Sequence, residues 1–228
     1  MRIGIIGAMQ IEVDNLKKHL KDTTEEVVSG VTFTSGRVDG VEVVAAVSGV
    51  GKVFAAICAE AMILTYKVDC VINIGVAGTL CDELGVMDVA IADKVVQHDM
   101  NTSALGDPVG LLSGLNEVFL PADQRLVQGI EKVVEAKGIH HKVGTIATGD
   151  LFLSKNSTKE NLHKNFGAIA GEMEGGSIGH VCYVNKVPFA ILRSISDGKG
   201  AEMDYQTFAV KAAQVGIEII LDYIKSVA

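Results

Sequence analysis

Short runs of β-branched and other apolar residues recur along this chain and alternate with longer segments of helical periodicity. Several of the runs are apolar at every position, which is typical of strands that are covered on both faces. A chain that alternates such strands with helices folds as an α/β domain around a buried sheet. We expect strands at Arg2–Gly7, Val41–Val47, Cys70–Ile74, Val89–Ala92, Lys142–Ile146 and Phe189–Ser194.

The clearest helical patterns lie between these runs, and the last one carries an apolar residue at every third or fourth position from Phe208 to Tyr223. The segment from His98 to Asp123 instead holds several glycines and prolines, and a loop of this length is usually functional or mobile. Without a linker or repeat, we expect one domain over residues 1–228. The predicted helices are Lys52–Tyr66, Gln124–Lys137, Gly176–Asn185 and Gln206–Ser226.

The amino-acid composition indicates in which cellular compartment the protein works and which kinds of partner it does not bind. The 228 residues are 48% hydrophobic, enough for a substantial core, yet no stretch approaches the roughly 20 uninterrupted apolar residues of a membrane helix. The apolar opening runs directly into Glu12 and Asp14 without a signal-peptide cleavage pattern, so we expect a cytoplasmic protein that binds no membrane. A net charge of -8 argues against nucleic acid, whose binding depends on clustered Lys and Arg.

The first candidate for chemistry is G-I-I-G-A-M at residues 4–9, a glycine-rich turn after the first strand. It lacks the G-x-G-x-x-G spacing of a dinucleotide site. Glu12 follows in what we expect to be the first helical turn, where the helix dipole favours a carboxylate, so a surface acid is the simpler interpretation. A second candidate, N-I-G-V-A-G-T-L at residues 73–80, follows a buried strand and could form either a pocket floor or a packing turn.

Two further segments carry carboxylates in apolar or glycine-rich surroundings. In G-E-M-E-G-G, Glu172 and Glu174 share one face if the segment is extended, and Met173 points away. In R-S-I-S-D, Arg193 and Asp197 close an apolar run. Arg193 could form a structural ion pair, and Asp197 could serve as a general acid, but the residues alone do not choose between these interpretations.

Several other kinds of site are not indicated. The six histidines show no H-E-x-x-H or H-x-x-x-H spacing, so we predict no metal, and no cofactor motif is present. The segment V-S-G-V-G-K, which contains Ser48, does not complete a phosphate-binding loop, and no G-x-S-x-G elbow occurs. Four widely spaced cysteines without a C-x-x-C pair are predicted to be reduced, structural thiols.

In order and spacing, these segments together resemble the 5'-methylthioadenosine/S-adenosylhomocysteine nucleosidases of the nucleoside phosphorylase superfamily. The matching motifs run from residue 3 to residue 197. The resemblance implies a single three-layer αβα domain with a central mixed, partly barrel-like sheet, working as a homodimer. The motifs are I-G-I-I-G-A-M-x-x-E-V, S-G-V-G-K-V-x-A-A, I-N-x-G-x-A-G, T-G-D-x-F, E-M-E followed by I-x-H-V-C, and V-P-F-x-x-x-R-x-I-S-D.

The resemblance also implies roles in cleaving the N-glycosidic bond of an adenine nucleoside. Asp197 would act as general acid at purine N7, Glu12 would activate water near Arg193, and Glu174 would hold the ribose hydroxyls. Such carboxylates suit a bond that breaks through a ribosyl cation. Phe152 would stack on adenine while the Leu153 backbone reads its edge, and the sugar and 5' group would lie against Met9, Val50 and Met173; Val76, Glu172 and Ser196 complete the predicted substrate site.

The chain departs from the family pattern at two places. Val76 stands where the family commonly has serine, close to the catalytic water. The segment 100–110 differs from the family segment that lends a partner-subunit aromatic to the 5' pocket, which leaves the preferred 5' substituent open. Two other functions also remain: a phosphorylase that uses phosphate in place of water, and a nucleoside-binding domain without catalysis.

Overall fold

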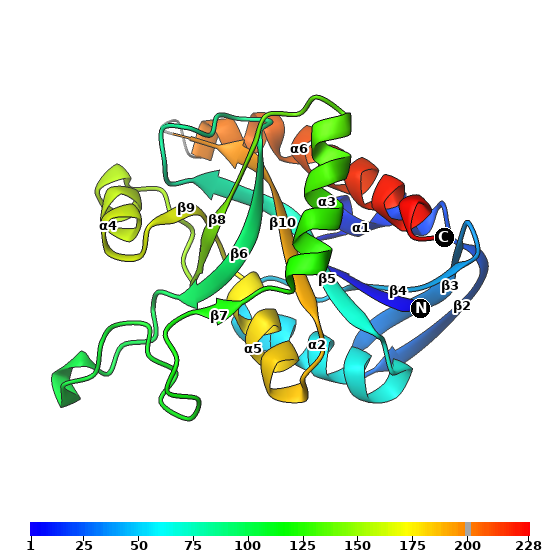
Figure 1. The fold of residues 1–228 in the computed structure, drawn as a ribbon, viewed down its shortest axis with the longest axis horizontal. Helices are drawn as coiled ribbons and strands as arrows, with labels where there is room; N and C mark the ends of the chain where they lie inside the picture. The colour runs from blue at the N-terminus through cyan, green and yellow to red at the C-terminus, as the bar shows by residue number, and fades with distance from the viewer. Residues whose placement is uncertain (199–201) are drawn as a thin grey trace.

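The computed structural model describes residues 1–198 and 202–228, in which ten strands form a single sheet with helices on its outside (Figure 1). The strands are β1 Arg2–Gly7, β2 Lys21–Val28, β3 Val31–Val38, β4 Val41–Val47, β5 Cys70–Thr79, β6 Val89–Gln97, β7 Leu120–Pro121, β8 His141–Thr148, β9 Ala168–Glu172 and β10 Phe189–Asp197. The helices are α1 Gln10–Lys17, α2 Lys52–Tyr66, the short 3-10 helix η1 Ser103–Leu105, α3 Gln124–Ala136, α4 Asn156–Phe166, α5 Gly175–Asn185 and α6 Glu202–Ser226.

Half of the sheet closes on itself. Strands β10, β6, β8, β9 and β5 follow one another in the sheet, and β5 pairs back onto β10, so these strands form a small barrel. Strand β5 belongs to both halves, because its first residues also pair with β1, which leads on to β4, β3 and β2. The mixed, partly barrel-like sheet expected from the family resemblance is therefore confirmed.

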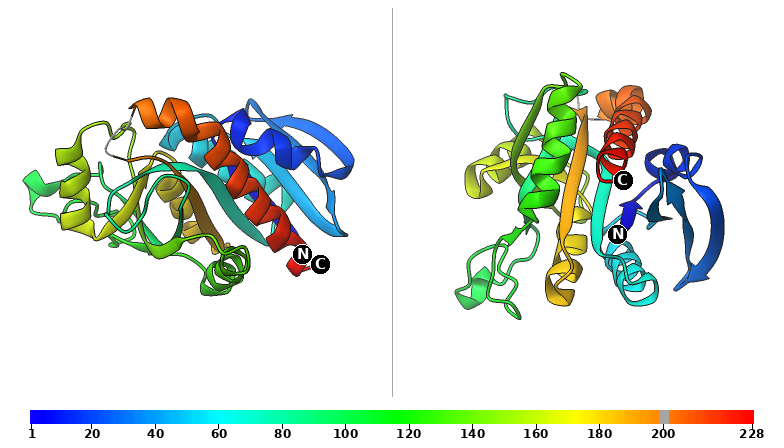
Figure 2. Two further views of the ribbon diagram at one scale, coloured as in Figure 1. Left: turned by 90° about the horizontal axis from the view of Figure 1, so that it is seen from above. Right: turned by 45° about the vertical axis from the view of Figure 1, so that its right-hand side comes forward.

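Helices cover the sheet on both sides. Helices α2 and α5 pack against each other, while α1 and α3 each pack against the long α6 on the other side (Figures 1 and 2). Helix α4 lies against β8 and β9 at the edge of the barrel. Within the described residues, no helix combines the length and apolar character needed to cross a membrane.

Every predicted strand and helix is present, and β1, β4 and α2 have the predicted bounds. Strands β5, β6, β8 and β10 continue farther than predicted, because barrel closure supplies hydrogen-bond partners beyond the point where polar or glycine residues interrupt the apolar runs. Strand β10 is buried at all nine positions, Arg193 and Asp197 included. The four cysteines are buried and free, as predicted.

Sequence patterns missed the hairpin of β2 and β3, and also α4 and β9. Strand β2 is polar and exposed along nearly its whole length, so it lacks the apolar alternation of a recognisable strand. Only the turns of these hairpins could have been recognised in the sequence. Ser29–Gly30 and Asp39–Gly40 connect directly paired strands, and all four residues have positive φ angles. Dipeptides of this kind mark two-residue hairpins.

Ile72 gives a test of the shared role of β5, because it is fully buried between Ile5 of β1 and Ala190 of β10. Ile72→Ala should lower the free energy of unfolding by about 2–5 kcal/mol in urea denaturation, since it opens a cavity where both halves of the sheet meet. The matched change Val27→Ala, at an exposed site on β2, should cost less than about 1 kcal/mol. Equal losses at the two positions would contradict this view of the core.

Candidate active site

A cavity of about 230 Å³ lies where the end of β5 meets the ends of β9 and β10. Although β9 runs antiparallel to β5, its pairing of Gly171 with Gly78 brings the β9–α5 turn to the same place as the carboxyl end of β10. The turns after β1 and before α2 complete the wall. The cavity is lined by every predicted site residue except Arg193: Met9, Glu12, Val50, Val76, Phe152, Leu153, Glu172, Met173, Glu174, Ser196 and Asp197.

Glu12 lies in the first turn of α1, as expected, but it is buried rather than on the surface. Its Oε2 accepts the backbone N–H groups of Ala8 at 2.7 Å and Met9 at 3.0 Å, so it caps its own helix. Its Oε1 accepts the N–H of Val76 at 3.0 Å. Gly75 makes this approach possible, since a Cβ atom there would lie 2.7 Å from Oε1.

The charge state of Glu12 is shaped by opposing effects. Burial raises the pKa of Glu12, and the charge of Arg193 and the three amide donors offset that rise only in part. Oε1 accepts a single amide, which leaves one of its lone pairs for another donor. Glu12 is therefore a carboxylate of increased basicity with an open acceptor position beside the cavity.

Glu172 and Arg193 form a fully buried ion pair. The guanidinium also donates to Asn73 Oδ1 and to the carbonyl of Leu192. Glu172 accepts the hydroxyl of Thr148 and the backbone N–H groups of residues 174 and 175. These donors and Arg193 outweigh the effect of burial and lower the pKa of Glu172. Protein groups hold both side chains, while Nε of Arg193 is buried without a hydrogen-bond partner among the described residues. Direct contact of either side chain with a ligand stays a prediction.

Glu174 differs from Glu172 although the two are nearly adjacent. The segment is not extended throughout, because β9 ends at Glu172 and Glu174 is the N-cap of α5. Its Oε1 accepts the N–H of Gly51 at 2.9 Å, and its Oε2 lies 3.9 Å from Arg193 Nη2. Burial and the neighbouring charge of Glu172 raise the pKa of Glu174. Its carboxylate faces the cavity with fewer donors than Glu172.

Asp197 ends β10 and is also buried. Ser196 Oγ donates to its Oδ1 at 3.0 Å. Its Oδ2 lies 3.0 Å from Nζ of Lys159, a buried lysine of α4 that the sequence patterns did not single out. Lys159 lies in the polar stretch K-N-S-T-K-E-N, which has the composition of a solvated surface, so the sequence carries no signal for this contact.

Aromatic and apolar side chains form the remaining wall. Phe152 and Tyr205 make an edge-to-face contact with ring centroids 5.6 Å apart, and the Tyr205 hydroxyl lies 3.3 Å from Met9 Sδ. The sequence patterns did not single out Tyr205, which lies in the first turn of α6, four residues of which precede the predicted start at Gln206. Phe152 is 42% exposed, so one edge of the cavity is an aromatic surface open to a planar ligand.

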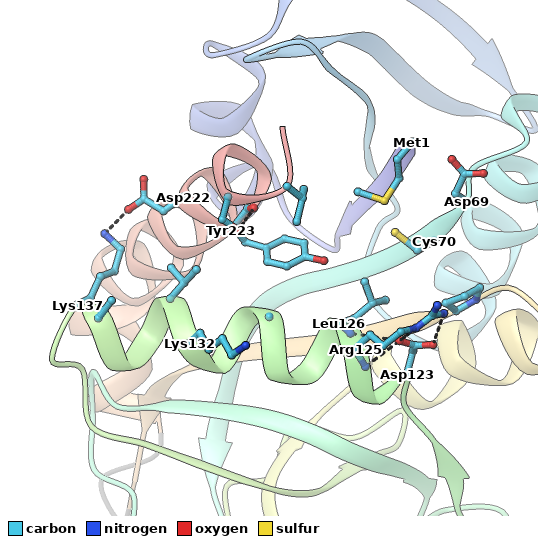
Figure 3. Close-up of a pocket in the computed structure, with 16 residues that line it drawn as sticks. Met1, Asp69, Cys70, Asp123, Arg125, Leu126, Lys132, Lys137, Asp222 and Tyr223 are labelled. Carbon is cyan, nitrogen blue, oxygen red and sulfur yellow. Dashed lines mark hydrogen bonds and ion pairs between the residues drawn. The ribbon is translucent and has the colours of Figure 1, made fainter.

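A larger hollow of about 1140 Å³ lies between α3, α6 and the start of β5 (Figure 3). Charged groups in it pair with one another, Lys137 with Asp222 at 2.7 Å and Arg125 with Asp123 at 3.1 Å. It adjoins Cys70, at the amino end of β5, whereas ligands of α/β sheets bind beyond the carboxyl ends of strands. The smaller cavity, with its converging buried carboxylates, is the better candidate for chemistry.

The cavity walls combine four carboxylates with apolar groups, and the described lining residues include no lysine or arginine. Such a lining disfavours an anionic ligand and stabilises positive charge that develops inside it. One group of side chains in the described residues, Glu131, Glu135 and His141, has a spacing that could hold a metal ion, but it lies on α3 and β8 outside the cavity.

Comparison with known proteins identifies the family. Residues 2–225 match the family model described as Phosphorylase superfamily. The 5'-methylthioadenosine/S-adenosylhomocysteine nucleosidase of Bacillus velezensis is 37% identical over 231 residues, with both chains fully covered.

Solved structures agree with this assignment. An aspartate-to-asparagine mutant of the Helicobacter pylori nucleosidase, with 5'-methylthioadenosine in its active site, has a TM-score of 0.95 at 33% identity and covers 99% of this chain and 98% of its own. The native futalosine hydrolase of Helicobacter pylori has a TM-score of 0.95 at 34% identity with the same coverage. With this identity over the full length, the chain belongs to the 5'-methylthioadenosine/S-adenosylhomocysteine nucleosidases of the phosphorylase superfamily.

Proposed function

We propose that this protein hydrolyses the N-glycosidic bond of 5'-methylthioadenosine and S-adenosylhomocysteine, and also of 5'-deoxyadenosine, releasing adenine and the 5-substituted ribose. Residues 1–228 form one nucleosidase domain in this proposal. The observation that carries it is the pair of buried carboxylates with different partners in one cavity: amide-held Glu12 and ammonium-bound Asp197. Hydrolysis requires a base at the water and an acid at the departing purine, and this pair can supply both.

Glu12 is the base that activates water. Its increased basicity favours removal of a proton from water, and the open lone pair of Oε1 gives the water a position. Val76 contributes its backbone N–H to the same oxygen, so the missing family serine hydroxyl leaves this support of Glu12 intact.

Glu174 holds the ribose hydroxyls and stabilises the ribosyl cation that forms as the bond breaks. It faces the cavity from the N-cap of α5, and the Gly51 amide fixes one of its oxygens. Arg193 and Glu172 hold Glu174 in position, since the backbone amides of residues 174 and 175 donate to Glu172. Met9, Val50 and Met173 line the sugar and the 5' substituent.

At the base end, Asp197 delivers a proton to N7 of adenine while Ser196 orients its carboxylate. Phe152, in contact with Tyr205, stacks on the purine, and the backbone of Leu153 reads its edge. Protonation makes adenine a better leaving group, and general acid groups of this kind typically contribute about 10²- to 10⁴-fold each.

We further propose a cytoplasmic homodimer in which the 98–123 loop of the partner subunit approaches the 5' pocket. Large apolar side chains are exposed on the neighbouring helices α2 and α5, beside Val50 at the cavity. An apolar surface next to a ligand site is a typical interface between subunits. The exposed residues are Val53, Phe54, Ile57 and Leu64 of α2, Tyr183 and Val184 of α5, and Leu105 of the loop.

Water, rather than phosphate, is the expected nucleophile, because Glu12 and Glu174 repel an anion and the described lining residues include no lysine or arginine to hold one. The purified protein should release adenine from 5'-methylthioadenosine in phosphate-free buffer, followed by chromatography of the products. Adding phosphate should not change the rate. Turnover only with phosphate, with a ribose 1-phosphate product, would instead identify a phosphorylase.

Asp197→Asn should lower kcat by about 10²- to 10⁴-fold, because asparagine cannot transfer a proton to N7. The variant should still bind 5'-methylthioadenosine, measured by calorimetry, which also shows that its site remains folded. An unchanged kcat would remove Asp197 from the chemistry and leave a binding role. Complete loss of both binding and turnover would point to a structural role.

The acid limb of kcat/KM should reflect the raised pKa values of Glu12 and Glu174, because both carboxylates act in their ionised form. The base must be ionised to accept a proton, so a pKa above the ordinary value of 4.5 moves the acid limb to higher pH. The rate constant should fall about tenfold per pH unit below that midpoint. Glu12→Gln should abolish most turnover at every pH. A wild-type acid limb centred at or below pH 4.5 would contradict this assignment.

A further inference from the structure

Lys159 is a buried cation beside the cavity that the mechanism above leaves without a role. Lysine is almost never this buried unless it is paired, and Lys159 is 5% exposed. Its Nζ donates to Asp197 Oδ2 at 3.0 Å and to the carbonyl oxygen of Gly198 at 2.8 Å. The two acceptors fix the ammonium group directly behind the carboxylate that meets the purine.

Lys159 lies between two hollows. It does not line the active cavity, so it reaches a ligand there only through Asp197. On the other side it lines a separate hollow of about 620 Å³, between the loop after β5 and helix α4. Lys159 therefore adjoins a second hollow that is separate from the active cavity, on the side where substrate does not bind in the proposed mechanism.

We propose that Lys159 supplies the proton that Asp197 passes to purine N7. This inference rests on the proposed nucleosidase function. As the bond between C1' and N9 breaks, its electron pair moves to the purine. Nζ of Lys159 passes its proton to the Asp197 carboxylate, and Asp197 passes a proton on to N7. The neutral amine then recovers a proton from water in the outer hollow, and the proton that Glu12 removes from the attacking water returns to solvent.

Charge balance favours this sequence of transfers. In the resting enzyme the ammonium and the carboxylate form a neutral pair. Once the proton has reached N7, the same pair carries one negative charge, at the moment when the ribose becomes cationic. A negative charge that appears with the cation stabilises the transition state more than the ground state, which is the requirement for catalysis.

Other titratable groups surround this corner of the fold. Glu160 and His163 lie on α4, and His163 bonds the carbonyl of Ala168 at 2.9 Å. Cys81, Asp82 and Glu83 lie on the loop after β5, where Glu83 pairs with Lys142 at 2.6 Å. From α6, Asp204 accepts the N–H of Gly198 at 3.2 Å, and Tyr205 faces the cavity. These groups are shared by the wild type and by Lys159 variants, so their effects cancel when the two are compared at one pH.

The test compares Lys159→Met with wild type in the hydrolysis of 5'-methylthioadenosine at pH 5.5 and pH 8.5. Without the ammonium group, Asp197 must take its proton from solvent, which supplies protons readily at pH 5.5 and poorly at pH 8.5. We expect kcat to fall by about 10²-fold at pH 8.5 and by less than about fivefold at pH 5.5, with little change in KM. A merely structural role lowers both rates equally. The exposed lysine of the same helix provides the matched control, Lys164→Met, which should match wild type.

Lys159→Arg separates charge from proton transfer, because arginine keeps the positive charge but does not lose a proton in proteins. It should stay at least about tenfold below wild-type kcat at both pH values. Wild-type rates in Lys159→Arg, or an equal loss in Lys159→Met at both pH values, would overturn the inference. An inactive wild type would instead refute the proposed function itself.

If Lys159→Met is unfolded at pH 8.5 by circular dichroism, Lys159→Ala with added ethylamine replaces it. Because Lys159 lines the outer hollow, we expect a small amine to enter the space that the truncated side chain leaves. Saturable recovery of kcat by ethylammonium, but not by tetramethylammonium, supports the inference because only the former carries a transferable proton. No recovery, or equal recovery by both ions, overturns it.

Discussion

The buried ion pair between Arg193 and Glu172 is the interaction on which the site depends. Two charges taken out of water are tolerated only when further hydrogen bonds satisfy them, and here the partners come from β5, β8, β10 and the β9–α5 turn. The pair therefore ties together the strands that close the barrel. It also fixes the start of α5, because Glu172 accepts two backbone amides of that turn.

The fixed β9–α5 turn also determines the charges that surround Glu174. Glu172 takes the close contact with Arg193, so Glu174 lies farther from the cation and next to a negative charge. Its pKa is raised where that of Glu172 is lowered, although only one residue separates them. The E-M-E motif thus places one carboxylate in the close ion pair with Arg193 and gives the other fewer donors at the same cavity.

The strands and the main helices could be predicted, because apolar runs and glycine turns are local signals, whereas the clustering of the motif residues was expected only from the family resemblance. The polar strand β2 gave no such signal except its two-residue turns. Lys159 and Tyr205 could not be recognised, since their roles come from tertiary contacts with Asp197 and Phe152. For Arg193 an ion pair with an acidic residue could be predicted. That the acid is Glu172 could not, because barrel closure brings the two residues together.

In the proposed reaction Glu12 accepts a proton from water while Asp197 donates a proton to the purine. The two carboxylates differ in the charge of the groups that bond them. Three neutral amides orient Glu12 while leaving it free to gain a proton. An ammonium group bonds Asp197, so a proton is stored beside it without an acidic carboxyl in the resting state. Neutral donors hold the carboxylate at the water and a charged donor bonds the carboxylate at the purine, so two carboxylates in one cavity can carry out opposite proton transfers.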